Sequence, residues 1–409
     1  MQKIIGSIFL FLFYSLPLIG QNSCPGITFT SQSQIDNFQE NYPGCTEILG
    51  NVTINGDSIY NLYGLDVLTS INGDLVIGDE YNLNFANQFL GDLTGLEELV
   101  FIGNDFIITW NMSLSSLNGL ESLSIIEGDL EIFGNEPLAS ITGLESLTYV
   151  GGDLEIDFCP ALTSLEGLEG LTAVEGDLEF NGNWGLTNLE GLDNVANIGG
   201  EFRIWFNKYL TSLMGLENLI SIGGDFIVDY NDALLDFSSL ENITSINGDI
   251  NISNNEMLGS MNGLDNIDAG SIIDITIVNN YSLNSCHVQS ICDYLVTPNG
   301  TVVIEGNAPG CNSIEEVEEA CLEVGIEESK ITSFILYPNP TDNGIITITL
   351  DNPHNIHLTC FNTFGQQVHQ QEITGKETVI DVSNWSPGIY LAVVYEWGKP
   401  VGRSKLMVR

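Results

Sequence analysis

The sequence repeats itself every 24 residues over most of its length. Glycine–acid pairs recur in this register, and their acids are Asp129, Asp153, Asp177, Glu201, Asp225 and Asp249. Gly-Leu pairs follow the same period, with leucines at Leu120, Leu144, Leu168, Leu192 and Leu216. A fixed period of this length indicates a solenoid, in which each repeat is one coil stacked on its neighbours.

Apolar residues occupy fixed positions in each coil, counted from the acid of the glycine–acid pair as position zero. They recur at +1, +3, +9, +12, +15, +18 and +21, in one coil as Leu178, Phe180, Leu186, Leu189, Leu192, Val195 and Ile198. The +1/+3 alternation predicts a short strand with one face inward, and the later spacing of three resembles leucine-rich coils. We predict an all-β solenoid of about nine coils over residues 46–280.

Two adjacent positions indicate a corner of the coil. Position +6 is mostly asparagine, whose buried amide can bond the backbone of adjacent coils; Cys159 replaces it once, and we expect that thiol to be buried and unpaired. Position +5 alternates in size: Trp110, Gly134, Phe158, Gly182 and Phe206, then Tyr230. The alternation predicts rings stacked in a confined corner, each over a glycine, with a carbohydrate platform as the alternative.

Two columns of carboxylates follow from the period, one at position zero and one at +16. Stacked coils lie about 4.8 Å apart, so the carboxylates of a column either recruit cations or accept hydrogen bonds from backbone N–H groups of their turns. The metal-ligand candidates, for Ca²⁺, are Glu121, Glu145, Glu169, Asp193, Glu217 and Glu241. No other cofactor is expected.

The outward positions +2 and +4 form the predicted broad sheet face. Their residues vary from coil to coil while the apolar positions do not, which is how solenoids build binding surfaces. Trp205 beside Arg203 is the predicted contact point, and Phe133 lies in the same +4 column.

The charge excludes several classes of partner. Residues 21–329 hold 49 Asp and Glu but only Arg203 and Lys208 as basic residues, so this region carries essentially all of the chain's net charge of −46. Binding to nucleic acid needs clustered Lys and Arg, and so does binding to an anionic membrane. The acidity favours solubility in salt, binding of divalent cations or attraction of basic partners.

Cysteines flank the repeats, where a solenoid needs caps over its end coils. We predict a Cys24–Cys45 disulfide and two bridges among Cys286, Cys292, Cys311 and Cys321, whose pairing the sequence does not decide. The period breaks near the start: Asp57 to Asp74 is 17 residues and Asp74 to Asp105 is 31. The extra residues predict a loop around 79–91.

The repeat region, about residues 24–321, resembles receptor L-domains, which are right-handed coils related to leucine-rich repeats. The resemblance rests on Gly128–Ile132, Gly152–Ile156, the stretch Leu162–Glu169 and the cysteine-bearing ends. It implies binding of a ligand or partner without catalysis. The residue content also favours a protein without catalytic activity, because the repeats contain no His between Cys24 and Ser285 and no nucleophile or phosphate-loop motif.

Both ends of the chain indicate export. Residues 1–20 read as a secretory signal peptide, with Lys3 ahead of an apolar stretch and Gly20 at the cleavage site, and no other membrane-spanning segment is found. Residues 333–409 read as short strands with Pro and Gly turns, typical of a small β-sandwich. The expected strands are 334–337, 345–350, 359–362 and 389–395.

This last segment resembles the type A C-terminal sorting domain of type IX secretion. The matching motifs are Tyr337–Pro340, Asn343-Gly344, Phe364–Val368, Ser386–Tyr390 and Lys405–Arg409. The resemblance implies secretion to the outer cell surface of a Gram-negative bacterium, with the secretion machinery as a partner.

The predicted organisation is a signal peptide (1–20), a capped solenoid (21–325), a linker (326–332) and a sorting domain (333–409). We expect a monomeric, non-enzymatic recognition or adhesion protein that binds a protein or glycan through the solenoid. The alternative is an acidic structural protein of the surface layer that binds divalent cations.

Overall fold

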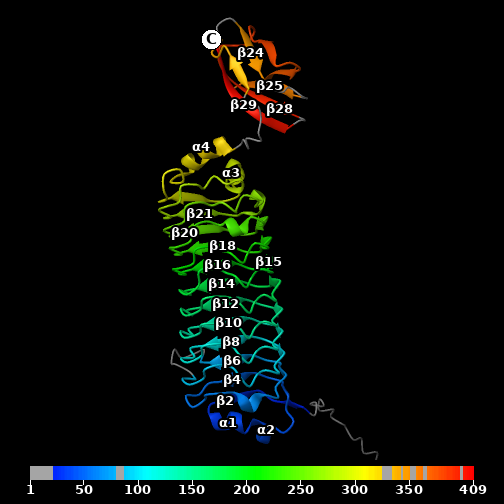
Figure 1. Ribbon diagram of the computed structural model, residues 1–409, viewed down its shortest axis with the longest axis vertical. Helices are drawn as coiled ribbons and strands as arrows, with labels where there is room; N and C mark the ends of the chain where they lie inside the picture. The colour runs from blue at the N-terminus through cyan, green and yellow to red at the C-terminus, as the bar shows by residue number, and fades with distance from the viewer. Residues whose placement is uncertain are drawn as a thin grey trace, which may run out of the picture. The chain divides into compact units, whose positions relative to one another are not determined.

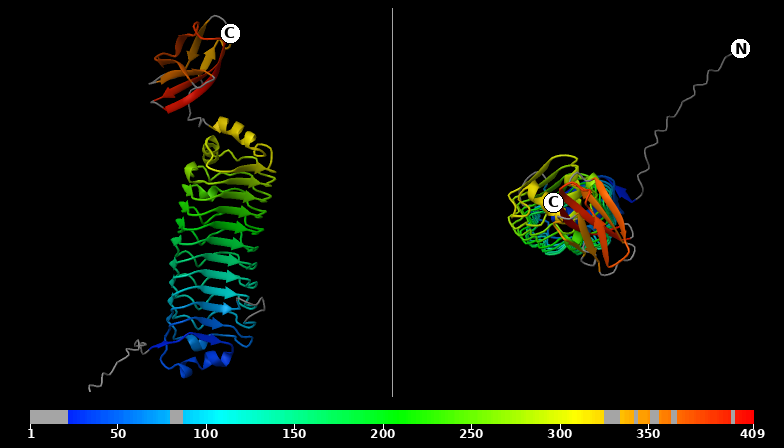
Figure 2. Two further views of the ribbon diagram at one scale, coloured as in Figure 1. Left: turned by 180° about the vertical axis from the view of Figure 1, so that it is seen from behind. Right: turned by 90° about the horizontal axis from the view of Figure 1, so that it is seen from above.

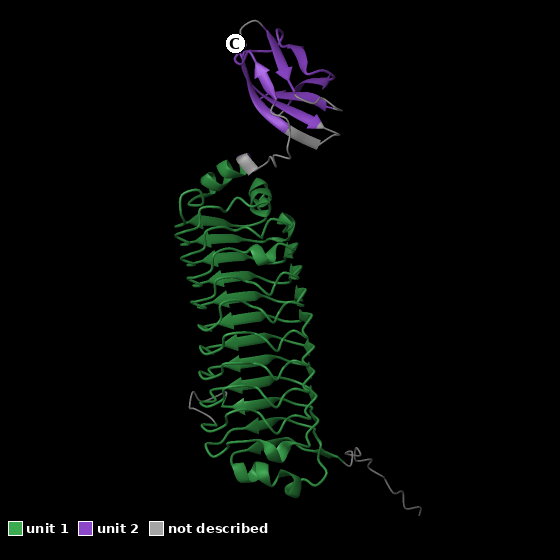
Figure 3. Ribbon diagram, in the orientation of Figure 1, with its two compact units in different colours: residues 1–321 green, residues 322–409 purple. Residues whose placement is uncertain are grey.

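The computed structural model describes residues 22–79, 87–324, 334–341, 344–350, 356–362, 366–396 and 399–409. The chain divides into two compact units, Met1–Cys321 and Leu322–Arg409 (Figure 3). The predicted signal peptide and the predicted linker lie outside the described residues.

The first unit is a β-solenoid of parallel strands, which lie one above the other in Figure 1. Its broad sheet has, within the described residues, twelve strands: β2 (Ile27–Phe29), β4 (Val52–Ile54), β6 (Leu75–Gly78), β8 (Phe106–Thr109), β10 (Leu130–Phe133), β12 (Leu154–Asp157), β14 (Leu178–Asn181), β16 (Phe202–Trp205), β18 (Phe226–Asp229), β20 (Ile250–Ser253), β21 (Ile275–Val278) and β22 (Val302–Glu305). The predicted solenoid is confirmed, and it extends beyond residues 46–280 at both ends.

Two-residue strands form a second, narrow side of most coils, and the coils can be followed from the opposite side in Figure 2. One narrow sheet contains β1 (Ser23–Cys24), β3 (Glu47–Ile48), β5 (Ser70–Ile71), β7 (Phe101–Ile102), β9 (Ile125–Ile126) and β11 (Tyr149–Val150). The next contains β13 (Ala173–Val174), β15 (Asn197–Ile198), β17 (Ser221–Ile222) and β19 (Ser245–Ile246). Short 3₁₀ turns occur at η1 (Tyr63–Leu65), η2 (Ser238–Leu240) and η3 (Ala269–Ser271).

The solenoid core consists of the predicted apolar positions. Neighbouring strands pair in register at the period of the sequence, so that Leu154 lies opposite Leu178 and Ile156 opposite Phe180. Leu168 and Leu192 are both fully buried in adjacent coils. Each coil therefore packs mainly on the coils directly before and after it.

The first coils correct the register that the glycine–acid pairs suggested. Val52 pairs with Leu75, an interval of 23 residues, so position zero of that coil is Asn51 rather than Asp57. The Oδ1 atom of Asn51 accepts a hydrogen bond from the backbone N–H of Asp74, as an acid does in later coils. The next interval remains long, and most of the predicted loop lies outside the described residues.

Short helices and disulfides close the ends of the solenoid. Helices α1 (Gln32–Asp36) and α2 (Phe38–Asn41) lie at the N-terminal end, where Cys24 bonds to Cys45. Helices α3 (Gln289–Val296) and α4 (Ile314–Val324) lie at the other end and are joined by Cys292–Cys321. A third disulfide joins Cys286 to Cys311. The structure thus selects one of the three pairings that the sequence left open.

The second unit contains two antiparallel sheets around its own core. One sheet contains β23 (Ile335–Tyr337), β24 (Ile345–Thr349) and β27 (Glu377–Asp381). The other contains β26 (Gln367–Ile373), β25 (Ile356–Asn362), β28 (Gly388–Glu396) and β29 (Lys399–Val408). Each predicted strand has a counterpart here, and β26, β27 and β29 are additional.

Candidate binding face of the solenoid

The asparagines at position +6 serve the architecture. Asn207 is fully buried; its Oδ1 accepts the backbone N–H of Asn183 at 3.0 Å, and its Nδ2 donates to the carbonyl of Phe180 at 2.8 Å. The same ladder continues through the other asparagines of the column. Cys159 takes one place in it, buried and free, and burial raises the pKa of its thiol to about 12. The side chains of this column bond to the backbone of neighbouring coils and are not available to a ligand.

The carboxylates at position zero are also engaged with the backbone. Asp153 accepts the N–H of Asp177 at 2.7 Å, and Asp129 accepts that of Asp153 at 2.8 Å. A Cβ atom on Gly152 would lie 1.9 Å from the Oδ1 of Asp129, which explains why glycine precedes the acid. Burial raises the pKa of Asp129, although its hydrogen bond from Asp153 acts the other way.

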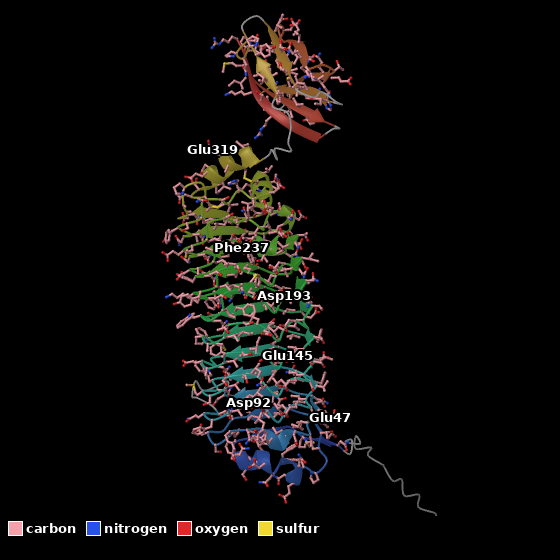
Figure 4. All side chains as sticks on the ribbon, viewed as in Figure 1. Glu47, Asp92, Glu145, Asp193, Phe237 and Glu319 are labelled. Carbon is pink, nitrogen blue, oxygen red and sulfur yellow. A yellow bond between two sulfur atoms is a disulfide. The ribbon has the colours of Figure 1, made fainter. Side chains whose placement is uncertain are left out.

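Five of the six +16 carboxylates that were the metal-ligand candidates close their own turns. Glu145 and Asp193, which lie on one side of the stack in Figure 4, each accept the N–H of the glycine two residues earlier at 2.9 Å. Glu121, Glu169 and Glu217 make the same bond, while Glu241 has Ser239 in place of the glycine. Across the described ranges, no three His, Cys, Asp or Glu side chains are grouped to hold a metal ion. We call the position-zero and +16 acids the corner carboxylates.

The +5 aromatic residues adopt the left-handed backbone conformation. Trp110, Phe158, Phe206 and Tyr230 have φ between 51° and 56°, where a bulky residue costs on the order of 1–2 kcal/mol. The rings stack as predicted: a Cβ on Gly134 would meet the ring of Trp110, and one on Gly182 would meet that of Phe158. The corner does not confine them, because Phe158 and Phe206 expose 43% and 44% of their surface.

The residues predicted to bind a ligand lie on the outer face of the broad sheet. Arg203 and Trp205 project from β16, with the guanidinium carbon 5.9 Å from the indole centroid. The Nε atom of Arg203 lies 2.5 Å from an oxygen of Glu201, and the Nε1 of Trp205 donates to Glu179 at 2.8 Å. Phe133, on β10, is separated from Trp205 in its column by Asp157 and Asn181. The structure therefore brings two of the three predicted residues together.

Aromatic rings gather at both ends of the +4 column between Phe133 and Trp205. The ring centroid of Phe133 lies 5.4 Å from the ring centroids of both Trp110 and Phe158. At the other end Trp205 lies 5.4 Å from Phe206, which stacks on Tyr230 at 4.7 Å. Between the two groups the +4 column holds Asp157 and Asn181 instead of a ring.

Asp157 and Asn181 were placed on an exposed column by the sequence, and the structure corrects this. Asp157 exposes 8% and Asn181 3% of their surface. Within the described residues neither Oδ1 atom has a hydrogen-bond partner, and a buried acceptor without a donor costs about 1–3 kcal/mol. Flanking side chains therefore enclose polar groups that the flat face would otherwise expose.

Burial and mutual repulsion change the acidity of this face. Desolvation, followed by the charge of Glu179, raises the pKa of Glu155 to about 7. The same two causes raise the pKa of Asp157 to about 7. We call Glu131, Glu155, Asp157 and Glu179 the face carboxylates. They repel each other along the pairing register, since Glu155 lies between Glu131 and Glu179.

Sequence reasoning placed the +2 and +4 columns on the outer face but singled out only Phe133, Arg203 and Trp205 as contact residues, and so it missed these acids. The sequence of the +4 column indicates them, because small polar residues lie between large rings. The column contains Thr109, Phe133, Asp157, Asn181, Trp205 and Asp229. The left-handed corner was also readable, since Asn254 and Asn279 share position +5 with the glycines and tolerate positive φ.

Comparison with protein families identifies the second unit. Residues 335–409 match the family described as secretion system C-terminal sorting domain. The C-terminal unit is a type IX sorting domain. The chain is accordingly a secreted or cell-surface protein. The chain has no match among curated proteins, and the resemblance of residues 24–321 to receptor L-domains stays a prediction.

The sorting domain carries a surface depression of about 550 Å³. Its lining includes Trp385, Tyr390 and the residues Ser386–Ile389, which belong to one of the motifs that identified the domain. The Tyr390 hydroxyl donates to the carbonyl of Ser386 at 2.7 Å and closes this turn. In the described part of the chain, no helix is both long and apolar enough to cross a membrane.

Proposed function

We propose that the chain is a non-enzymatic recognition or adhesion protein that binds its partner through the outer face of the broad sheet. The +2 column changes from Glu179 to Arg203 to Ile227 in successive coils, while the inward positions beside it remain Leu, Ile, Val or Phe. Fixed architecture with a variable face is the arrangement by which solenoids bind partners.

The exposed left-handed aromatic residues carry this proposal. Gly134, Gly182 and Asn254 occupy the same position without strain, so the fold itself does not require a large ring there. Strain that the architecture does not need is typical of functional sites. Together with Phe133 and Trp205, these rings give the edge of the face an apolar surface that a partner can cover.

Binding to cells tests the proposal. The purified full chain, fluorescently labelled, is applied to bacterial and host cells and to arrays of glycans and proteins. Trp205→Ala and Phe158→Ala should each reduce the signal, whereas Tyr281→Ala removes an exposed ring far along the stack and should leave it unchanged. Equal binding by all variants would contradict a role for this face.

The alternative of a cation-binding surface layer is tested by melting with and without calcium. Because the corner carboxylates already accept backbone hydrogen bonds, we expect millimolar Ca²⁺ to shift the melting temperature little. A large upward shift would support the alternative instead.

Delivery is assigned to the sorting domain, which implies contact with the secretion machinery. Deletion of residues 331–409 should leave the chain in the periplasm with its solenoid folded, as shown by fractionation and circular dichroism. A truncated chain that still reached the cell surface would contradict this division of labour.

A further inference from the structure

The face carboxylates and their aromatic neighbours form a patch with a definite layout. Strands β10, β12, β14 and β16 pair in register, so two columns run side by side on the outer face. One column carries Glu131, Glu155 and Glu179, and the other carries Phe133, Asp157, Asn181 and Trp205. We call these seven residues the acid–aromatic patch. Successive members of a column lie about 4.8 Å apart.

The patch needs positive charge and hydrogen-bond donors. Its four carboxyl groups lie on neighbouring strands, where Asp157 is buried and Glu155 is half-buried. The Oδ1 atoms of Asp157 and Asn181 are acceptors without a donor among the described residues. Asn181 is uncharged, so its open acceptor indicates a missing donor independently of the acidic cluster.

Arg203 shows what such a donor looks like. It occupies the +2 position one coil beyond Glu179, where its guanidinium bonds to Glu201, reaches Glu179 at 3.8 Å and lies over the ring of Trp205. The next positions of the same grid, at Glu155 and Glu131, have acids and no basic side chain. The face therefore already accommodates one guanidinium between carboxylates and an aromatic ring.

We propose that the acid–aromatic patch binds arginine side chains of a protein partner. A guanidinium is planar, has several N–H donors in a fixed fork and is weakly hydrated. It can bond to the half-buried Glu155 while stacking on Phe133 or Trp205. It reaches Asp157 and Asn181 once the flanking side chains move aside. An ammonium group has the charge without the planar fork. A neutral sugar has donors and apolar faces but leaves the repulsion among the carboxylates in place. The inference rests on the proposed recognition function and specifies the chemistry of the partner.

The test uses the purified full chain and a peptide in which arginines alternate with glycines. Isothermal titration at low salt should show binding that weakens about tenfold or more with citrulline in place of arginine, because citrulline keeps the shape and loses the charge. Raising the salt should weaken it further. Binding should also change the fluorescence of Trp205, whose indole N–H contacts Glu179, and this change should be lost in Trp205→Phe.

Matched variants localise the interaction. Glu155→Gln with Asp157→Asn should reduce the affinity about tenfold or more, whereas Glu256→Gln removes an exposed charge outside the patch and should change it less than about twofold. A melting curve shows whether the double variant folds. If it does not, the arginine–citrulline comparison on the unmodified chain still decides the result.

Three outcomes would overturn the proposal. The citrulline peptide could bind as well as the arginine peptide, or Glu256→Gln could weaken binding as much as the patch variants, which would mean non-specific attraction to an acidic surface. A neutral oligosaccharide could bind at the patch while the arginine peptide does not, which would make the face a glycan platform. In each case the cell-binding experiment remains valid, so failure of this inference is distinguishable from failure of the proposed function.

Discussion

The corner carboxylates and the face carboxylates are the same residue types in the same coils, yet they have different partners. Asp153 at a corner accepts a backbone N–H at 2.7 Å, while four residues later the Oδ1 of Asp157 accepts nothing within the described residues. The next coil thus supplies a backbone N–H to the corner oxygen, whereas at the face, in the part of the chain that the structure describes, the Oδ1 of Asp157 stays unpaired although Asn181 bonds to the carboxyl group. Acids that recur with the repeat therefore need their local hydrogen-bond donors identified before a role is assigned to them.

Among the substitutions considered, one in the apolar core should change the stability most, and the effects at the corner and face carboxylates can be compared with it. Leu192→Ala removes a fully buried side chain of the solenoid core, and we expect a loss of about 2–5 kcal/mol in the free energy of unfolding. Chemical denaturation of the full chain measures this loss. The unfolding transition of the solenoid is followed separately from that of the second unit. A loss below about 0.5 kcal/mol would contradict the common register of the coils.

Removing a corner carboxylate should destabilise the solenoid. Asp153→Ala leaves the N–H of Asp177 without its acceptor, and we expect a loss of about 1–3 kcal/mol. Asp153→Asn keeps an oxygen in the same place and should recover most of the stability. If the alanine variant were as stable as the parent, these acids would have to be assigned a role other than closing the corner.

Removing a face carboxylate should have the opposite sign. The folded-state pKa of Asp157 is about 7, above that of the unfolded chain, so its contribution to stability is fully present below about pH 4 and is lost as the pH rises through 7. Asp157→Asn should therefore match the parent at pH 4 and exceed its stability at pH 8 by on the order of 1–2 kcal/mol. Destabilisation at pH 8 would place Asp157 among the structural acids.

The aromatic corner should give the smallest change in stability. Phe158→Gly removes ring contacts with Phe133 and also relieves a backbone at φ 51°, so the two effects oppose each other. We expect a net change within about 1 kcal/mol, measured by the same denaturation. A loss beyond about 3 kcal/mol would show that the rings hold the coils together, which would remove the main support for a binding role.

The sequence predicted those parts of the molecule that repeat with the coil. The inward leucines, the Asn207 column and the Gly-Asp corner each occur many times, so a single period reveals them. The length of the stack was underestimated, because the end coils at Ile27–Phe29 and Val302–Glu305 lack the glycine–acid pair. The disulfide pairing depends on where the end helices fold back, which spacing alone does not determine.

The candidate site was predicted only in part, because it is where the repeat varies. Arg203 and Trp205 stood out as residue types in an acidic chain, and they do lie together. Asp157 and Asn181 are buried beside Phe133 and Trp205 of the adjacent strands, which is a property of the stacked face and not of one coil. Each variable position therefore has to be compared with its neighbours on the same strand and on the adjacent strands of the sheet.

The most direct test of the difference between corner and face is the titration of Asp157 itself. Carboxyl ¹³C signals are followed against pH in the full chain labelled at aspartate, and the resonance missing in Asp157→Asn identifies this group. We expect an apparent pKa near 7, shared with Glu155 through their mutual repulsion. An apparent pKa at or below about 3.9, the ordinary value for aspartate, would contradict it.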